Sequence, residues 1–294
     1  MNQLSIIIVN YKVKDLLDNC LKSIFDNSEN IELDVIVVDN NSQDGSLEMI
    51  KTKYPQVNLI AHPENSGFAR ANNLGFRETK SPHLRKGGGD KHDYVLLLNP
   101  DMQILPYTLE NMINWMDKNP QASVVGCHLI DQNRKTLHHI RRFPTLGDQL
   151  AITLKIPHIL PFILNNYLQK DFDYSRASKV DSIRGAFFML RRKVYEELNG
   201  LDERYFIWFE EVDFCQKVAR SGGEVWYTPT AECIDYVGKS FEQVPRGVTQ
   251  KYFQNSMLKY FKKWHPIWQF IVLKLAWLIG SLVGKLNIKS KVKT

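Results

Sequence analysis

Zinc-binding and redox cysteine motifs are absent from this sequence. Its four cysteines, at positions 20, 127, 215 and 233, are far apart and show no CxxC spacing, so neither a zinc site nor a thiol redox centre is predicted from them. We expect them to be reduced thiols in the core. The sequence also lacks zinc-finger spacing, an RNA-binding aromatic signature and a long basic arm, so nucleic acid is not an expected partner despite the net charge of +6.

A secretory leader and a long apolar span are missing as well. The first residues lead straight into an apolar run without the segments of a signal peptide, so the cytoplasm is the expected compartment. Residues 267–283 (IWQFIVLKLAWLIGSLV) are apolar but include Lys274 and fall short of the ~20 residues that a spanning helix needs. Their tryptophans and lysine-rich flanks favour an amphipathic helix lying on an anionic membrane, at the inner face of the cell membrane. A helix packed on the domain or on another subunit is the alternative.

What the sequence does contain is a regular alternation of apolar runs and helical patterns. The run LSIIIVN at 4–10 is typical of a strand buried on both faces, and a helical spacing of apolar residues follows at 15–26. The same order repeats at 33–38 and after residue 46. This alternation predicts an α/β fold with a doubly wound, mostly parallel sheet. Further strands are expected at 57–61, 94–98 and 124–130.

The sequence suggests one α/β domain over residues 1–245 and a C-terminal helical, membrane-associating tail over 246–294. Residues 81–92 (SPHLRKGGGDKH) are glycine-rich and charged, which predicts a flexible insertion. Their triple glycine lacks the GxxxxGK[ST] pattern of a phosphate-binding loop. The less regular segment 141–178 is expected to cover one face of the sheet.

Polar residues follow four of the predicted strands. They are Asn10-Tyr11, 39–42 (DNNS), 65–73 (NSGFARANN) and 99–101 (NPD). Ligands of doubly wound sheets bind outside the carboxyl ends of the strands, so these residues are candidates for one site. Each alone also suits a turn or a helix cap. Their repetition at successive strand ends favours a binding site.

These pieces resemble the inverting family 2 glycosyltransferases of GT-A fold, and among them the rhamnosyltransferase-like branch. The resemblance rests on the ordered motifs SIIIVNY, VVDNNSQDGS, ENSGFARANNLG, LLLNPD, RGAFFMLRR and LDERYFIWFEEVDFCQKVARSGGEVWYTP. It implies transfer of a sugar from a nucleotide-diphosphate donor, dTDP-rhamnose being the commonest in this branch, to a glycan or lipid-linked glycan in cell-surface polysaccharide synthesis. A non-catalytic nucleotide-sugar or polysaccharide-binding protein on the same fold is the alternative.

The resemblance also implies a donor site. Asp39 is expected to accept from a base N–H or a ribose hydroxyl, with capping of the following turn as its structural alternative. Gly67 is expected to let the backbone approach the diphosphate, and Asn72 to hydrogen-bond the donor. The donor-binding residues implied are Val9, Asn10, Tyr11, Asp39, Asn41, Gly67, Asn72, Asn99 and Asp101.

A divalent metal, Mg²⁺ or Mn²⁺, is implied by the resemblance of LLLNPD to an Asp-x-Asp motif. Asn99 stands in its first acidic position and Asp101 in its second, and a cation on a diphosphate needs only one or two protein carboxylates. The family often has a histidine near the end of the domain that completes the metal site. Here Asp235 stands in that place, either as an oxygen ligand or as the sign of a lost ligand.

The acidic segment 210–213 (EEVD) is the implied catalytic centre. Matched by position, Glu211 is the general base that takes the proton of the acceptor hydroxyl. The structural alternative is an acidic helix start without a catalytic role, because carboxylates are favourable at helix N-termini. The aromatic Trp208 either stacks on an acceptor sugar or belongs to the core. The acceptor-binding residues implied are Arg184, Gly185, Ala186, Trp208, Glu210 and Asp213, with orientation of the helix as the alternative role for Glu210 and Asp213.

Overall fold

A central sheet organises the chain in the computed structural model, which describes residues 2–29, 31–79, 93–236 and 245–278. In this part of the chain the strands form one nine-stranded sheet in the order β3-β2-β1-β4-β8-β6-β9-β5, with β7 paired to β9. The strands are β1 (Asn2–Asn10), β2 (Ile31–Asp39), β3 (Asn58–Ala61), β4 (Asp93–Leu98), β5 (Met102–Ile104), β6 (Ala122–Ile130), β7 (Ser178–Val180), β8 (Phe187–Arg191) and β9 (Glu224–Asp235).

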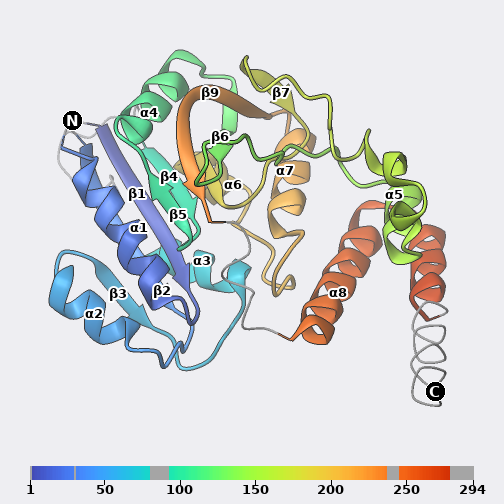
Figure 1. Cartoon of the computed structure of the whole chain (residues 1–294), viewed down its shortest axis with the longest axis horizontal. Coiled ribbons are helices and arrows are strands. Elements are labelled where there is room, and N and C mark those ends of the chain that lie inside the picture. The colour runs from blue at the N-terminus through green and yellow to red at the C-terminus, as the bar shows by residue number, and fades with distance from the viewer. Residues whose placement is uncertain (1, 30, 80–92, 237–244, 279–294) are drawn as a thin grey trace.

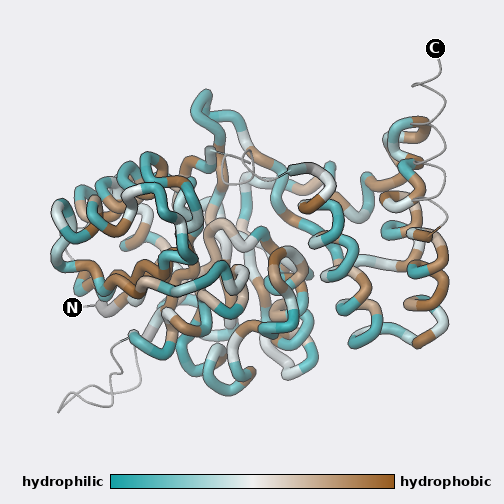
Figure 2. The backbone as a smooth tube through the Cα atoms, turned by 90° about the horizontal axis from the view of Figure 1, so that it is seen from below, coloured by the Kyte–Doolittle hydropathy of each residue, from teal (hydrophilic) through white to brown (hydrophobic). Residues whose placement is uncertain are grey.

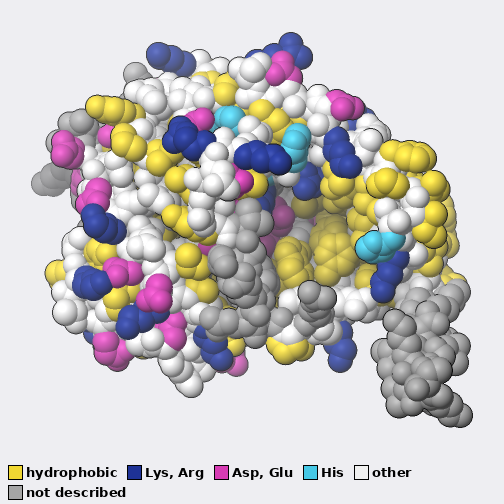
Figure 3. All heavy atoms as spheres, viewed as in Figure 1, with side chains coloured by type: hydrophobic (Ala, Val, Ile, Leu, Met, Phe, Trp, Pro, Cys, Tyr) yellow, Lys and Arg dark blue, Asp and Glu magenta, His cyan; other side chains and the backbone are white. Residues whose placement is uncertain are grey.

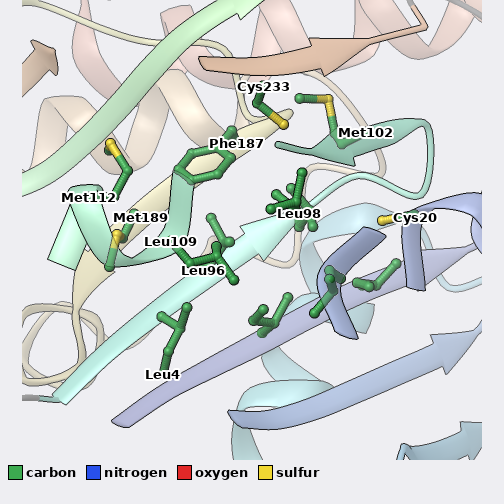
Figure 4. Packing of buried hydrophobic residues seen from close by; sticks show 14 of the residues in the cluster. Leu4, Cys20, Leu96, Leu98, Met102, Leu109, Met112, Phe187, Met189 and Cys233 are labelled. Carbon is green, nitrogen blue, oxygen red and sulfur yellow. The ribbon is translucent and has the colours of Figure 1, made fainter. Parts of the chain in front are cut away.

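Helices cover both faces of the sheet, as a doubly wound fold requires (Figure 1). One core packs α1 (Lys14–Asp26), α2 (Ser46–Lys53) and α4 (Thr108–Lys118) against the sheet. Figure 4 shows this core, where side chains of β1, β4 and α4 meet. The second core packs α3 (Phe68–Glu78), α6 (Arg192–Glu197) and α7 (Glu210–Arg220) on the opposite face.

The predicted mostly parallel sheet is confirmed, with antiparallel strands added to it: β5 and β7 both pair antiparallel with β9. Strands β1, β2, β3 and β4 pair in parallel, because each buried run is followed by a helix that returns the chain to the same edge. Strand β8 lies antiparallel between β4 and β6. Its apolar residues belong to the motif RGAFFMLRR, but its direction was not predicted, since an apolar run carries no information on strand direction. The predicted insertion at 81–92 lies outside the described residues.

The segment 141–178 covers the sheet only in part. Phe143, Phe172 and Tyr174 pack against the second core, as expected. Its helix α5 (Leu146–Thr153), followed by the short 3-10 helices η2 (Ile156–His158) and η3 (Pro161–Leu164), instead lies beside the C-terminal helices (Figure 1). The expectation that this whole segment covers one face of the sheet is therefore wrong for α5.

The C-terminal segment is built into the fold by a third core. Helix α8 (Arg246–Trp264) is followed by helical residues 267–278. Met257, Phe261 and Leu273 from these helices are buried against Tyr205 and Phe209 of the α/β domain. Figure 2, viewed from below, shows hydrophobic residues in the sheet and again in this helical block. The boundary expected at residue 245 thus separates two parts of the chain that share a core.

This packing predicts a large difference between two neighbouring leucines. Leu273 is 0% exposed and Leu275 is 53% exposed. We expect Leu273→Ala to lower the free energy of unfolding by about 2–5 kcal/mol, because the truncation leaves a cavity. Leu275→Ala is expected to change it by less than about 0.5 kcal/mol. Chemical denaturation of the two variants checks this, and equal losses would show that the third core does not stabilise the domain.

Candidate active site

The carboxyl ends of β1 and β2 are joined by a buried polar network. The parallel register places Asn10 beside Asp39, and Asn10 Nδ2 donates to Asp39 Oδ2 at 2.7 Å and to Ser42 Oγ at 2.9 Å. Asp39 Oδ1 accepts from the backbone N–H of Ser42 at 2.9 Å. Asp39 therefore caps the turn after β2, which is the structural alternative that the sequence left open. Asn10 is fully buried and holds this carboxylate in place.

A cavity of about 410 Å³ opens at this edge of the sheet. Four of the residues predicted for the donor line it: Val9, Tyr11, Gly67 and Asn99. The predicted residues Asn10, Asp39, Asn41, Asn72 and Asp101 are not on its walls. The sequence analysis missed several lining residues, among them Lys12, Asn40, Phe206, Val248 and Tyr252.

Gly67 is needed for a reason other than the one expected. Its φ is +85°, and a Cβ there would lie 2.4 Å from the carbonyl oxygen of Phe206. The backbone N–H of the next residue, Phe68, donates to that same oxygen at 2.7 Å. The close backbone approach is thus made by the protein's own loop at 202–209, which leads to the acidic segment. Any larger residue at position 67 would push this loop away.

The structure places Asn41 and Asn72 in local roles. Asn72 is buried, and its Nδ2 donates to the Phe68 carbonyl one turn earlier in α3. Asn41 has a left-handed φ of 62°, and its Oδ1 accepts from Gln43 Nε2. The sequence predicted that both residues contact the donor, but neither of them lies on the wall of the first cavity. Asn40 lies on the cavity wall instead, and its amide donates to the Gly67 carbonyl.

The two predicted metal ligands lie at the same end of the sheet. Asp101 immediately precedes β5, which pairs with β9 so that Met102 stands opposite Asp235. The backbone N–H of Tyr236 donates to the Asp101 carbonyl at 3.0 Å. Both carboxylates are almost fully buried. Within the described ranges there is no cluster of three or more metal-binding side chains, so a cation here would take its remaining ligands from the donor diphosphate and water.

Asp235 already has a cationic partner. Its Oδ2 lies 2.8 Å from Nη1 of Arg184, which the sequence assigned to the acceptor. A guanidinium on a buried carboxylate offsets the cost of burying the charge. This ion pair makes Asp235 a weaker candidate metal ligand than Asp101, and it ties the predicted donor end of the sheet to the predicted acceptor residues.

The acidic segment begins after two residues in unusual conformations. Trp208 and Phe209 have φ values of 64° and 70°, the left-handed region that costs a residue with a side chain about 1–3 kcal/mol. The third core holds this turn, because the Phe209 ring contacts the rings of Phe253 and Tyr260, each at 5.5 Å between centroids. Helix α7 then starts at Glu210. Strain of this kind is concentrated at functional sites.

Glu211 lies on the wall of a second cavity, of about 450 Å³. Burial raises the pKa of Glu211, while backbone N–H groups at the start of α7 and the charge of Arg184 act in the opposite direction. The Oε2 atom of Glu211 has no hydrogen-bond partner among the described atoms. A carboxylate on a cavity wall with a raised pKa and an oxygen that lacks a hydrogen-bond partner is suited to accept a proton.

The structure places the other residues predicted to bind the acceptor in different surroundings. Trp208 and Arg184 line the second cavity with Glu211. Gly185 lies against Glu211, but a Cβ there would make only ordinary contact, at 3.5 Å. Ala186 is buried and lies on neither cavity wall, and its carbonyl accepts from the Asn99 N–H at 3.0 Å. Glu210 is buried and absent from the cavity wall.

Asp213 is a structural anchor and makes no acceptor contact in this geometry. Its side chain is 0% exposed, and its carboxylate accepts from Trp264 Nε1 at 2.7 Å and from Tyr205 OH at 3.2 Å. Lys263 Nζ lies 2.8 Å from the same carboxylate. The residue therefore joins α7 to the end of α8, which is the helix-orienting alternative, and it is not on the wall of the second cavity.

A Rossmann-like sheet with a cavity at its carboxyl edge and buried acids beside it is the architecture of enzymes that act on nucleotide-linked substrates. The profile of glycosyl transferase family 2 matches residues 5–199. The chain belongs to glycosyl transferase family 2 and is a glycosyltransferase. A second profile, described as the N-terminal domain of galactosyltransferase, matches residues 169–237.

Curated relatives are similar over most of the chain. An N-acetylglucosaminyl-diphospho-decaprenol L-rhamnosyltransferase of Mycobacterium tuberculosis is 26% identical over 82% of this chain and 78% of its own length. The rhamnosyltransferase WbbL of Escherichia coli is 27% identical over 79% of this chain and 82% of its own length. The low-salt glycan biosynthesis hexosyltransferase Agl10 of Haloferax volcanii is 25% identical over 80% of this chain and 67% of its own length.

Solved structures confirm the predicted GT-A fold. The mannosyltransferase PcManGT from Pyrobaculum calidifontis, in complex with GDP-Man and Mn²⁺, has a TM-score of 0.59 and 16% identity, covering 99% of this chain and 80% of its own. GalNAc-T7 with UDP, GalNAc and Mn²⁺ has a TM-score of 0.61 and 13% identity, covering 88% of this chain and 49% of its own. At such identities the likeness concerns the fold alone.

The buried acids predict a pH dependence of stability. Burial and the neighbouring Glu211 raise the pKa of Glu210 well above its ordinary value of 4.5, so the native state binds this proton more tightly than the unfolded chain does. Stability is then lost as pH rises from about 4.5 through the raised pKa. When the pH rises from 4.5 to 8, we expect the free energy of unfolding of Glu210→Gln to fall by less than that of the unmodified protein. Glu197→Gln, on the surface of α6, is the matched control; denaturation midpoints that vary identically in all three proteins would contradict the prediction.

Proposed function

We propose that this glycosyltransferase is an inverting enzyme that moves a sugar from a nucleotide-diphosphate donor to a glycan or lipid-linked glycan. The observation that carries the proposal is the position of Glu211 on a cavity separate from the one at the sheet edge. The two cavities adjoin along the loop at 206–209, which gives Phe206 and Ile207 to the first and Trp208 and Phe209 to the second. Donor and acceptor can therefore approach each other from opposite sides of this loop.

In the proposed reaction, Glu211 takes the proton of an acceptor hydroxyl as the oxygen attacks the anomeric carbon of the donor sugar. The new carbon–oxygen bond forms as the bond to the diphosphate breaks on the opposite face, so the configuration inverts. The charge of Arg184, which lowers the pKa of Glu211, helps this carboxylate to be ionised before the transfer. Glu211 takes up the proton, and the electron pair of the broken bond leaves with the nucleoside diphosphate.

The residues present fit a divalent metal, Mg²⁺ or Mn²⁺, on the donor diphosphate. Asp101 offers a buried carboxylate next to Asn99, which lines the first cavity. Asp101 would hold the cation, and Asp235 would assist only by loosening its contact with Arg184. Such a cation, when bound, stabilises negative charge on the leaving diphosphate.

The sugar is proposed to be rhamnose from dTDP-rhamnose, and the product a cell-surface polysaccharide. Two relatives that match about four-fifths of the chain are named as rhamnosyltransferases, which supports this choice. The relative from Haloferax volcanii is named as a hexosyltransferase, so a hexose donor is the competing possibility. A panel of dTDP-, UDP- and GDP-sugars, compared for thermal stabilisation in the presence of Mn²⁺, distinguishes the two.

Substitution of the base tests the proposed chemistry. We expect Glu211→Gln to reduce kcat by at least about 100-fold, because the amide cannot take the acceptor proton. Binding of a nucleoside diphosphate with Mn²⁺, measured as thermal stabilisation that a chelator removes, is expected to stay unchanged. Glu197→Gln is the matched control and should transfer sugar at the normal rate. Near-normal transfer by Glu211→Gln would rule out this base, and stabilisation that persists in chelator would rule out the metal.

The enzyme is further proposed to work on an anionic membrane, at its cytoplasmic face. Among the described helices, none combines the length and the hydropathy needed to cross a bilayer. One side of the helix at 267–278 is buried in the third core, whereas its other side is exposed and apolar. The exposed apolar residues of this helix are Ile267, Trp268, Ile271, Leu275 and Leu278.

A second apolar segment adjoins this helix. The chain after α5 exposes Leu154, Ile159, Leu160, Phe162 and Ile163, and α5 shares the third core with the C-terminal helices. Figure 3 shows hydrophobic side chains gathered over this end of the molecule. Residues 246–294 contain Arg246 and nine lysines but no aspartate or glutamate. Apolar insertion together with attraction of basic residues to anionic lipid is the pattern of peripheral membrane binding.

Vesicle binding tests the membrane proposal. We expect the protein to sediment with phosphatidylglycerol vesicles and much less with vesicles of phosphatidylcholine alone. The double variant Ile271→Glu/Leu275→Glu should bind the anionic vesicles at least about 10-fold more weakly, because each apolar side chain contributes about 1.5–3 kcal/mol on burial. Tyr107→Glu alters an exposed aromatic residue at the start of α4 and is the control. Unchanged binding of the double variant would refute this surface.

A further inference from the structure

The second cavity contains a cation that the proposed chemistry does not use. Arg141 lines this cavity together with Glu211. Its Nη1 donates to the carbonyls of Ile140 at 2.8 Å and Leu168 at 3.4 Å, and no carboxylate of the described residues forms an ion pair with it. Burial lowers the pKa of Arg141, and the nearby Arg184 lowers it further. The half-buried guanidinium therefore carries a charge that no acid among the described residues balances.

The other cation of the cavity is balanced. Arg184 lies 2.8 Å from the carboxylate of Asp235 and also acts on the pKa of Glu211. Among the described residues, no carboxylate pairs with Arg141 in this way. A guanidinium without an acidic partner in a cavity is a site for an oxyanion, because it offers several donors in a planar fork that matches phosphate oxygens.

A neutral histidine stands beside this guanidinium. His139 lines the same cavity and is 4% exposed. Neither of its ring nitrogens has a partner among the described atoms. Burial and the charges of Arg141 and Arg184 lower the pKa of His139 to about 3, so the imidazole is uncharged at neutral pH and has one N–H to donate. A buried donor without a partner is costly unless a ligand satisfies it.

The residues that line the cavity also indicate which substrate would carry the oxyanion. Glu211, the proposed base, lines the same cavity, so under the proposed function a molecule that reaches Arg141 is the acceptor. The aromatic residues Trp208 and Phe253 line the cavity and pack against the third core. That core is shared by α5, whose continuation carries the exposed apolar residues at 154–163. A hydroxyl site, an anion site and an apolar exit thus occur in one region.

We propose that Arg141 and His139 bind a phosphate group of the acceptor, and hence that the acceptor is a sugar joined through phosphate or diphosphate to a lipid. This inference rests on the proposed function, since it places the acceptor hydroxyl at Glu211. The phosphate at Arg141 fixes the sugar relative to the base, and the hydrocarbon chain leaves toward the apolar end of the molecule.

Binding of soluble isoprenoid probes tests the subsite. The full-length protein is first saturated with nucleoside diphosphate and Mn²⁺, so that the donor cavity is filled, and is then titrated with farnesyl diphosphate, farnesol or inorganic pyrophosphate. We expect Arg141→Met to weaken binding of farnesyl diphosphate by about 10- to 100-fold, the range for losing a charged hydrogen bond. Farnesol should bind both proteins equally weakly. Arg142→Met removes the same charge at the neighbouring exposed position and should bind farnesyl diphosphate normally.

Three results would overturn the proposal. They are unchanged binding of farnesyl diphosphate by Arg141→Met, equally tight binding of farnesol and farnesyl diphosphate, and pyrophosphate binding as tight as that of farnesyl diphosphate, which would indicate a free-phosphate site. Arg141→Lys, which keeps the charge, provides a second variant if Arg141→Met fails to fold, and should show a smaller loss. Because Glu211→Gln tests proton transfer and these titrations test binding alone, the subsite and the proposed chemistry fail separately.

Discussion

The buried carboxylate of Asp213 holds the candidate active site together. It lies in α7 two residues after the proposed base, and its partners Lys263 and Trp264 come from the end of α8. A carboxylate in this position is tolerated only with such partners, and removal of one of them from a buried pair costs about 3–5 kcal/mol. The helix that carries Glu211 is therefore fixed by the C-terminal segment. What looks in sequence like an appended tail is a structural part of the site.

The same segment sustains the strained turn before α7. The left-handed conformations of Trp208 and Phe209 are stable because Phe253 and Tyr260 of α8 contact the Phe209 ring. On the other side of the loop, the absence of a side chain at Gly67 leaves room for the Phe206 carbonyl oxygen. The loop at 206–209 is thus held by α8 and by the donor edge of the sheet together. It forms the partition between the two cavities, so movement of α8 would affect both substrates at once.

Sequence reasoning succeeded where the signal is local. Runs such as LSIIIVN and YVLLL identify buried strands, and the polar residues after them do lie at one edge of the sheet. It failed where a role depends on residues far away in the chain. The partners of Asp213 are about fifty residues distant, and Arg184 meets Asp235 only through the sheet. Arg141 belongs to no motif, because its proposed role rests on the lack of an acidic partner among the described residues, which only three-dimensional packing reveals.

The charges of the chain are divided in a way that suits a reaction at a membrane. The net charge of +6 is exceeded by the basic residues of 246–294 alone, so the rest of the chain is slightly acidic. Inside the fold, at the start of α7, burial raises the pKa of Glu210 and Glu211. In the proposed membrane binding, attraction to anionic lipid acts through the C-terminal helices. Since these helices also fix α7, the proposed membrane binding and the alignment of the proposed base depend on the same block of structure.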